Sequence, residues 1–149
     1  MRVFFIGICG TAMGNAAVLL KKQGHEVAGS DLGVYPPMSE VLSGSGIELF
    51  KGFDEKALLL WNPDRVVVGN AVSRGNPQVE YILKTRKFPF VSLPQLIGED
   101  LIKKRPSLVV AGTHGKTTTT SLAAFALNQI GSSPGYLVGG VPLDLPSGN

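Results

Sequence analysis

Residues 2–20 read Arg-Val-Phe-Phe-Ile-Gly-Ile-Cys-Gly-Thr-Ala-Met-Gly-Asn-Ala-Ala-Val-Leu-Leu, and this stretch decides the fold. Its first five residues predict a buried strand, because four of the five are large and apolar. From Thr11 to Gln23, apolar side chains recur at the spacing of one helical face, and Gly24 suits the left-handed position that ends a helix. The sequence therefore predicts a strand, a glycine-rich loop and a helix in that order.

The same alternation of short apolar runs and helical stretches continues along the chain. Strands are expected at 26–29, 47–50, 65–68, 90–91 and 108–111, and helices at 36–43, 56–61, 76–86, 94–104 and 119–130. This alternation predicts an α/β fold, with a Rossmann-like, open and mostly parallel sheet that has helices on both faces. A polar stretch with a proline at 103–106 indicates two parts: a domain at 1–104 and the beginning of a second domain at 105–149.

The composition narrows the class of protein. The chain has 149 residues, of which 44% are hydrophobic and 17% charged, so it can form a hydrophobic core. Its net charge of +3 comes from scattered basic residues, and the cluster at 103–105 suits a helix end, so no nucleic-acid partner is expected. One cysteine fits a reducing compartment, and no apolar run resembles a leader or a membrane span. We therefore expect a cytoplasmic protein without a membrane partner.

The first glycine loop has the spacing Gly7-x-x-Gly10-x-x-x-Gly14 between the first strand and the first helix. Free N–H groups at a helix start attract phosphate, and glycine lets a ligand approach the backbone, so the loop suits a diphosphate. Asp31 follows Gly10 by 21 residues, where an acid that binds ribose usually lies. The candidate binding residues are Gly7, Cys9, Gly10, Thr11, Ala12, Met13, Gly14 and Asp31.

Two features of this loop limit its interpretation. The spacing departs from the G-x-G-x-x-G fingerprint, which favours a diphosphate nucleotide other than NAD and leaves a simple tight turn as the alternative. Cys9 is interpreted as a small buried side chain, because a catalytic thiol needs a nearby base and the sequence places none beside it.

A second glycine loop follows the apolar run at 107–111. It reads Gly112-Thr113-His114-Gly115-Lys116-Thr117-Thr118, and a helical stretch comes after it. Strand, glycine loop, Lys-Thr and helix form the arrangement that binds ATP: backbone N–H groups surround the phosphates, Lys116 neutralises them, and the Thr117 hydroxyl ligates Mg²⁺. The loop is shorter than a full Walker motif, which would have glycine where Val110 stands. A spacer role for His114 is favoured over a catalytic one.

Together these motifs resemble the muramyl ligase family, whose members use ATP to join amino acids or peptides to UDP-N-acetylmuramic acid in the bacterial cell wall. The resemblance runs along the whole chain and is most specific at 29–31, 34–39, 69–77, 112–118 and 139–142. The stretches at 35–39 and 69–77 look most like members that join a peptide, and members that join alanine are the alternative.

The resemblance implies a role for each motif. The loop from Gly7 to Gly14 would hold the UDP diphosphate, Asp31 would contact the uridine, and Asn70, Ala71 and Arg74 would lie beside the diphosphate or sugar. Lys116 and Thr117 would serve the catalytic step, in which ATP phosphorylates the muramyl carboxylate and the incoming amine displaces phosphate. The later parts of the family's central domain and its C-terminal domain have no counterpart in these 149 residues. The chain is therefore expected to bind the UDP-sugar and not to catalyse ligation alone.

Two other classes of protein stay open on the residues alone. A non-catalytic module that binds a dinucleotide such as NAD would use the first glycine loop and Asp31, but it has no use for the stretches at 34–39 and 70–77. A small independent ATPase would use the second loop, but it would need an acid that organises Mg²⁺ on a later strand, and the sequence supplies none.

Overall fold

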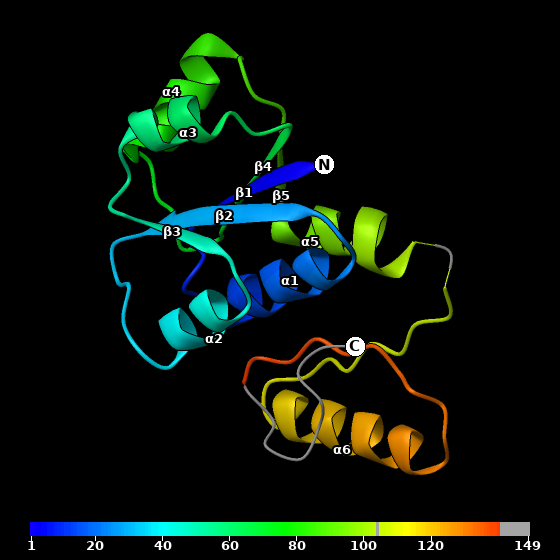
Figure 1. Ribbon diagram of the computed structural model, residues 1–149. Coiled ribbons are helices and arrows are strands. Elements are labelled where there is room, and N and C mark those ends of the chain that lie inside the picture. The colour runs from blue at the N-terminus through cyan, green and yellow to red at the C-terminus, as the bar shows by residue number, and fades with distance from the viewer. Residues whose placement is uncertain (104, 141–149) are drawn as a thin grey trace.

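Five parallel strands form one open sheet in the computed structural model, which describes residues 1–103 and 105–140 (Figure 1). The strands are β1 (Arg2–Ile6), β2 (Glu26–Asp31), β3 (Glu48–Lys51), β4 (Arg65–Val68) and β5 (Phe90–Ser92), in the spatial order β3-β2-β1-β4-β5. Every pairing is parallel. The chain therefore adds strands on one side of β1 and then crosses to its other side, which places a topological switch point between β1 and β4.

Helices cover both faces of the sheet (Figure 1). The helices are α1 (Thr11–Lys22), α2 (Met38–Gly44), α3 (Glu55–Trp61), α4 (Pro77–Thr85), α5 (Leu93–Leu96) and α6 (Lys116–Gln129). The side chains of β1 alternate between two cores: Val3 and Phe5 join the cluster with α1 and α2, whereas Phe4 and Ile6 join the cluster with α3 and α4. The sheet is thus buried on both sides, as the apolar strand sequences predict.

Most of the predicted elements are confirmed within a few residues. The strand at 65–68 matches β4, and β2 extends two residues further than expected, so that Asp31 is its last residue. The predicted cap of α4 is present, because the Asn76 side chain accepts hydrogen bonds from the N–H groups of Gln78 and Val79 at 3.1 and 3.2 Å. Gly24 has φ +87°, as expected of a glycine that ends a helix.

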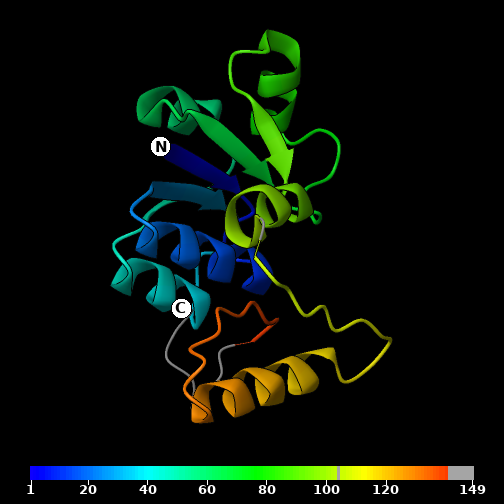
Figure 2. The same ribbon diagram turned by 90° about the vertical axis from the view of Figure 1, so that its right-hand side faces the viewer.

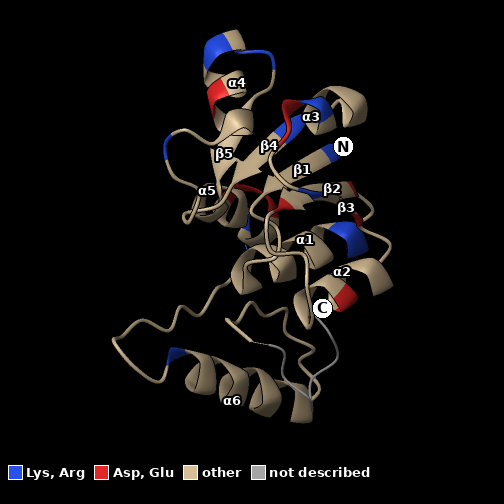
Figure 3. Ribbon diagram, turned by 90° about the vertical axis from the view of Figure 1, so that its left-hand side faces the viewer, with Lys and Arg blue, Asp and Glu red and all other residues tan. Residues whose placement is uncertain are grey.

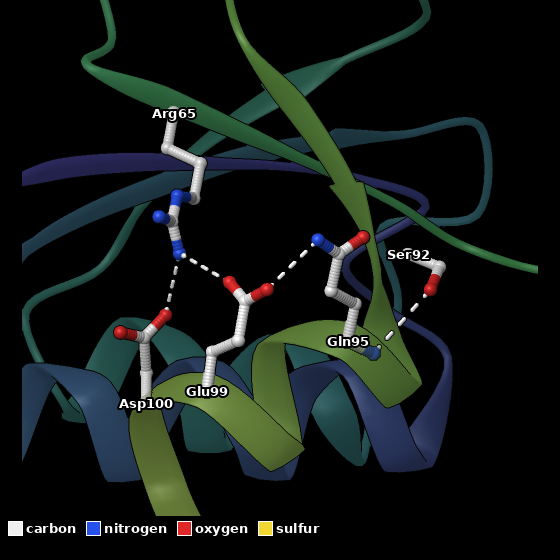
Figure 4. Close-up of polar contacts among 5 residues, drawn as sticks. All are labelled: Arg65, Ser92, Gln95, Glu99 and Asp100. Carbon is white, nitrogen blue, oxygen red and sulfur yellow. Dashed lines mark hydrogen bonds and ion pairs between the residues drawn. The ribbon is translucent and has the colours of Figure 1, made fainter. Parts of the chain in front are cut away.

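The helix expected at 94–104 divides into α5 and a π-helical segment, η1 (Ile97–Ile102). Arg65, at the beginning of β4, contacts the first turn of η1: its guanidinium is 2.7 Å from the Asp100 carboxylate and 3.5 Å from the Glu99 carboxylate (Figure 4). Gln95 donates to Glu99 at 2.9 Å, and the Ser92 hydroxyl accepts from the Gln95 backbone. These polar contacts join the sheet to the widened turn, a feature that the 3.6-residue pattern does not encode.

The strand predicted at 108–111 is wrong in this structure, where residues 106–111 are neither helix nor strand. The physical reason is the lack of a neighbouring strand among the described residues, which leaves Leu108 74% and Val109 75% exposed. Helix α6 begins at Lys116, three residues earlier than expected. It lies beside the sheet domain and not against the sheet itself (Figure 2). Three residues of the predicted motifs, Lys104, Val141 and Pro142, lie outside the described part of the chain.

No helix among the described residues is long and apolar enough to cross a membrane.

Candidate functional site

A cleft of about 1370 Å³ lies at the carboxyl edge of the sheet. Its walls come from the loop after β1, the segment after β2 and the loop after β4. Open α/β sheets bind ligands where the strand order reverses, and here that point lies between β1 and β4. The position of the cleft is therefore the one that the strand order favours for a ligand.

The glycine loop after β1 is a tight turn held against the end of β2. Gly7 has φ +84°, a conformation that favours glycine, and the N–H groups of Gly7 and Ile8 donate to the Ser30 carbonyl at 2.8 and 3.2 Å. Gly10 is the N-cap of α1, and no side chain caps the helix there. The N–H groups of the first turn of this 12-residue helix are thus available to an anionic ligand at the cleft.

Asp31 connects two walls of the cleft. Its carboxylate accepts the Cys9 N–H at 2.9 Å through one oxygen and the Gly33 N–H at 3.0 Å through the other. Both oxygens therefore serve the backbone of the cleft, and each retains a lone pair for a ligand hydroxyl. The ribose contact predicted for Asp31 stays a prediction, and the structure adds a second role in holding the glycine loop.

A buried chain of hydrogen bonds joins two of the elements that carry the cleft. The Ser30 hydroxyl donates to the Gln78 side-chain oxygen at 2.5 Å, and the Gln78 amide donates to the Asp54 carbonyl at 2.9 Å. Ser30 and Gln78 are both fully buried. This link joins β2 to the first turn of α4, so the loop after β4 is fixed relative to the glycine loop. Sequence reasoning missed it, because a glutamine one residue after a helix-starting proline resembles a surface side chain.

The structure brings most of the predicted sugar-nucleotide residues together at one cleft. Those that line it are Gly7, Cys9, Gly10, Thr11, Asp31, Ala71 and Arg74. Asn70 and Ala12 are exposed but outside the lining, whereas Met13 and Gly14 are buried in the packing of α1. A side chain on Gly14 would collide with Met38 of α2, since its Cβ would stand 2.3 Å from the Met38 sulfur. The binding roles of these four residues stay predictions.

The cleft also has lining residues that the motif analysis did not assign to binding. The segment after β2 contributes Tyr35, which is 70% exposed, and the cis-bonded pair Pro36–Pro37. Gly139 and Gly140, more than a hundred residues further along the chain, line the same cleft. The proline-rich stretch was a signal for the first group, but nothing in the sequence placed the glycine pair beside the first loop.

The Cys9 thiol is not activated. Burial, assisted by the nearby Asp31 charge, raises the pKa of Cys9 to about 11. The thiol is therefore protonated at neutral pH. The sequence predicted a small buried side chain, but Cys9 is only partly buried: it packs against the core cluster of α1 and also lines the cleft.

The second glycine loop, residues 112–118, leads directly into α6. Gly115 has φ +75° and is the N-cap of the 14-residue helix α6. The Lys116 ammonium group donates to the carbonyls of Gly112 and Thr113 at 2.6 and 3.0 Å, so it is held over its own loop. Thr113, His114, Thr117 and Thr118 are exposed. A cation and uncapped helix N–H groups can donate to phosphate oxygens, whereas a threonine hydroxyl oxygen is a ligand type that Mg²⁺ accepts.

Charge is sparse around this loop (Figure 3). Lys116 is the only Lys, Arg, Asp or Glu in the described residues from 106 to 140. No acidic side chain of that segment neutralises it, so the ammonium group and the helix dipole act together on an approaching anion. Within the described residues no group of three His, Cys, Asp or Glu side chains is placed to hold a metal ion.

The fold and the cleft define an α/β domain of the open, doubly wound class, with the cleft at its topological switch point. A family model described as "Mur ligase family, catalytic domain" matches residues 2–105. The chain belongs to the Mur ligase family.

Individual relatives give finer comparisons. The chain is 50% identical over 142 residues to UDP-N-acetylmuramate--L-alanyl-gamma-D-glutamyl-meso-2,6-diaminoheptandioate ligase of Escherichia coli (strain K12). This match covers 95% of this chain and 31% of that protein. It is 41% identical to UDP-N-acetylmuramate--L-alanine ligase of Psychrobacter sp. (strain PRwf-1), over 93% of this chain and 28% of the relative. The chain thus spans about 30% of the length of these curated relatives.

A solved structure extends the match to three dimensions. The structure of UDP-N-acetylmuramate:L-alanyl-gamma-D-glutamyl-meso-diaminopimelate ligase from Neisseria meningitides superposes with a TM-score of 0.93 at 43% identity, over 99% of this chain and 45% of that one. The superposition therefore includes helix α6 as well as the sheet domain.

Proposed function

We propose that this chain provides the UDP-N-acetylmuramate site of a cytoplasmic, ATP-dependent ligase that joins the peptide L-alanyl-γ-D-glutamyl-meso-diaminopimelate to that sugar in murein recycling. The observation that supports it most is the cleft at the switch point, which is lined both by the uncapped start of α1 and by Arg74 from the loop after β4. A peptide is favoured over alanine as the amine, because the identity is 50% to the peptide-joining relative and 41% to the alanine-joining one.

The diphosphate is assigned to the glycine loop. Backbone N–H groups at the start of α1 would bind its oxygens, and the Arg74 guanidinium would neutralise the remaining charge from the opposite wall. Asp31 would hold the loop and accept a ribose hydroxyl. The exposed ring of Tyr35 and the Pro36–Pro37 pair supply apolar surface at the same cleft for the uracil.

The second loop is assigned to ATP. Lys116 would exchange its two carbonyl acceptors for phosphate oxygens, and the Thr117 hydroxyl would hold Mg²⁺. When bound, Mg²⁺-ATP supplies the phosphoryl group that activates the muramyl carboxylate for attack by the amine. The 149 residues carry no site assigned to the amine, so the chain by itself is proposed to bind the sugar nucleotide without ligating it.

Calorimetric titration of the 149-residue chain tests the binding proposal. We expect saturable heat with UDP-N-acetylmuramate, weaker binding of UDP, and none with NAD. The variant Gly10→Val should abolish binding without loss of fold, because Gly10 has φ −62° and ψ 135°, and a Cβ there meets nothing closer than 3.6 Å. Gly44→Val is the matched control, since a Cβ at Gly44 has no neighbour within 4 Å and the residue lies outside the cleft lining.

Three outcomes separate the classes of protein. A folded wild-type chain that gives no heat with UDP-N-acetylmuramate contradicts the proposed substrate. Saturable binding of NAD that is lost in Asp31→Ala would favour the non-catalytic dinucleotide module. Unchanged affinity in a folded Gly10→Val variant would mean that the glycine loop is only a turn.

A further inference from the structure

Asn15 of α1 connects the sheet domain to the segment that follows α6. Its side-chain amide nitrogen donates to the Val138 carbonyl at 2.9 Å and to the Gly140 carbonyl at 3.0 Å. More than 120 residues separate these partners in sequence. Both N–H hydrogens of one amide thus serve one short segment, and Asn15 lies only one turn beyond the glycine loop that begins α1.

The segment that Asn15 holds is packed against the sheet domain. Leu137 packs against the core cluster that includes Met13 and Ala16 of α1, and Val138 is 5% exposed. In two views the segment at 131–140 runs between α6 and the layer of α1 and α2 (Figures 1 and 2). Apolar burial thus holds the segment against the sheet domain, and the two hydrogen bonds from Asn15 determine which of its residues lie beside α1.

The same segment contacts both candidate sites. Gly139 and Gly140 line the cleft that contains the first glycine loop. Both glycines are also near Thr117: a Cβ built on Gly139 would stand 3.7 Å from the Thr117 hydroxyl oxygen, and one on Gly140 would stand 3.7 Å from its methyl carbon. One backbone segment is therefore a wall of the sugar-nucleotide cleft and a neighbour of the residue assigned to Mg²⁺.

We propose that Asn15 is a positioning residue that couples the two sites, by holding the Gly139–Gly140 wall against the cleft and thereby setting the position of Thr117. The inference rests on the proposed function for the identity of the two ligands, but not for the coupling itself. A ligand that presses on Gly139 and Gly140 from the cleft would restrict the start of α6 through this wall. Loss of the Asn15 amide would leave each site formed and uncouple them.

Hydrogen exchange on the 149-residue chain, resolved by residue with NMR, tests the coupling without any ligand. The Thr119 amide reports the order of the start of α6, because it donates to the Gly115 carbonyl at 2.9 Å. In Asn15→Ala we expect this amide to exchange about tenfold faster, as for the loss of 1.4 kcal/mol of local stability, while the Cys9 amide, which donates to Asp31, is unchanged. Asn15→Asp is isosteric but places an acceptor against two carbonyl oxygens, so its effect should be at least as large as that of the alanine variant. Gln23→Ala, which removes an exposed amide next to the same helix, is the control and should resemble wild type.

A second measurement adds UDP-N-acetylmuramate. In the wild type, binding should slow exchange at Thr119 as well as at Cys9, and in Asn15→Ala only Cys9 should be protected. Unchanged ligand-free exchange at Thr119 in both Asn15 variants overturns the inference, as does equal protection of Thr119 in wild type and variant. If the wild type binds no UDP-sugar, the proposed function fails, and the ligand-free comparison still decides the role of Asn15.

Discussion

Replacing Asp31 by asparagine separates the two roles assigned to its carboxylate. In the wild type, one oxygen accepts the Cys9 N–H at 2.9 Å and the other accepts the Gly33 N–H at 3.0 Å. Asparagine has one carbonyl oxygen, so its NH₂ group must face one of these two N–H donors. One partly buried donor is left without a partner, which we expect to lower the free energy of unfolding by about 2 kcal/mol.

This loss is large enough to measure by thermal unfolding. For a chain of this size, about 2 kcal/mol corresponds to a fall in Tm of roughly 4–8 °C. Because the Cys9 N–H lies in the glycine loop, calorimetry should also show about tenfold weaker binding of UDP-N-acetylmuramate, equivalent to 1.4 kcal/mol. The control is Asp64→Asn, because the exposed Asp64 accepts only the Arg2 N–H among its described contacts and an asparagine oxygen can keep that bond. Its Tm should fall by less than about 2 °C.

The two measurements give distinct outcomes. A Tm within about 1 °C of wild type, together with unchanged affinity, would refute the reasoning that Asp31 holds the two loops. Weaker binding with an unchanged Tm would mean that Asp31 contacts the ligand alone and has no part in fixing the loop.

Two further predictions concern packing and the thiol at the cleft. Gly14→Ala should lower the free energy of unfolding by about 1–3 kcal/mol, because its Cβ would stand 2.3 Å from the buried Met38 sulfur. In thermal unfolding, the double variant with Met38→Ala should lose less stability than the sum of the two single variants. Purely additive losses would contradict the contact. The pKa of Cys9 is raised to about 11, so alkylation by iodoacetamide at pH 8 should be roughly 100-fold slower than for an ordinary exposed thiol. The folded chain should also lose stability as pH rises from about 8.5 towards 11, because in that range the thiol ionises in the unfolded chain but not in the folded one. Rapid alkylation of the folded chain at pH 8 would contradict the raised pKa.

The sheet could be predicted from the sequence because each strand carries its own evidence. Apolar runs such as 65–68 are short, bounded by polar residues and separated by helical stretches, so local pattern and global fold agree. The apolar run at 108–111 has the same local pattern but forms no strand, because a strand needs a neighbour and the described chain offers none there. Pairing is a property of the whole sheet, which a local pattern cannot report.

Part of the candidate site could also be predicted from the sequence, as most of the sheet could. Glycine spacing and the position of Asp31 identified two walls of the cleft, since loops after parallel strands share one edge of the sheet. The contacts of Asn15 and Gln78 were not predictable, because each depends on a polar side chain meeting backbone or side-chain atoms from a distant element. Such long-range pairs leave no periodic signature in a single sequence.

The parallel pairing of β1 with β4 also fixes when the cleft can form during synthesis. The register pairs Val3 with Arg65 and Ile6 with Val68. One edge of β1 therefore stays unpaired until residues more than sixty positions further along the chain have been synthesised. At ordinary translation rates, the 37 residues from Asp31 to Val68 take roughly 2–7 s to make. During that time β1 can pair with β2 and the glycine loop can close on Ser30, but the opposite wall of the cleft has not yet left the ribosome. A nascent chain would therefore form the complete cleft only after β4 is made, and capture of the proposed ligand by stalled chains of increasing length would report that moment.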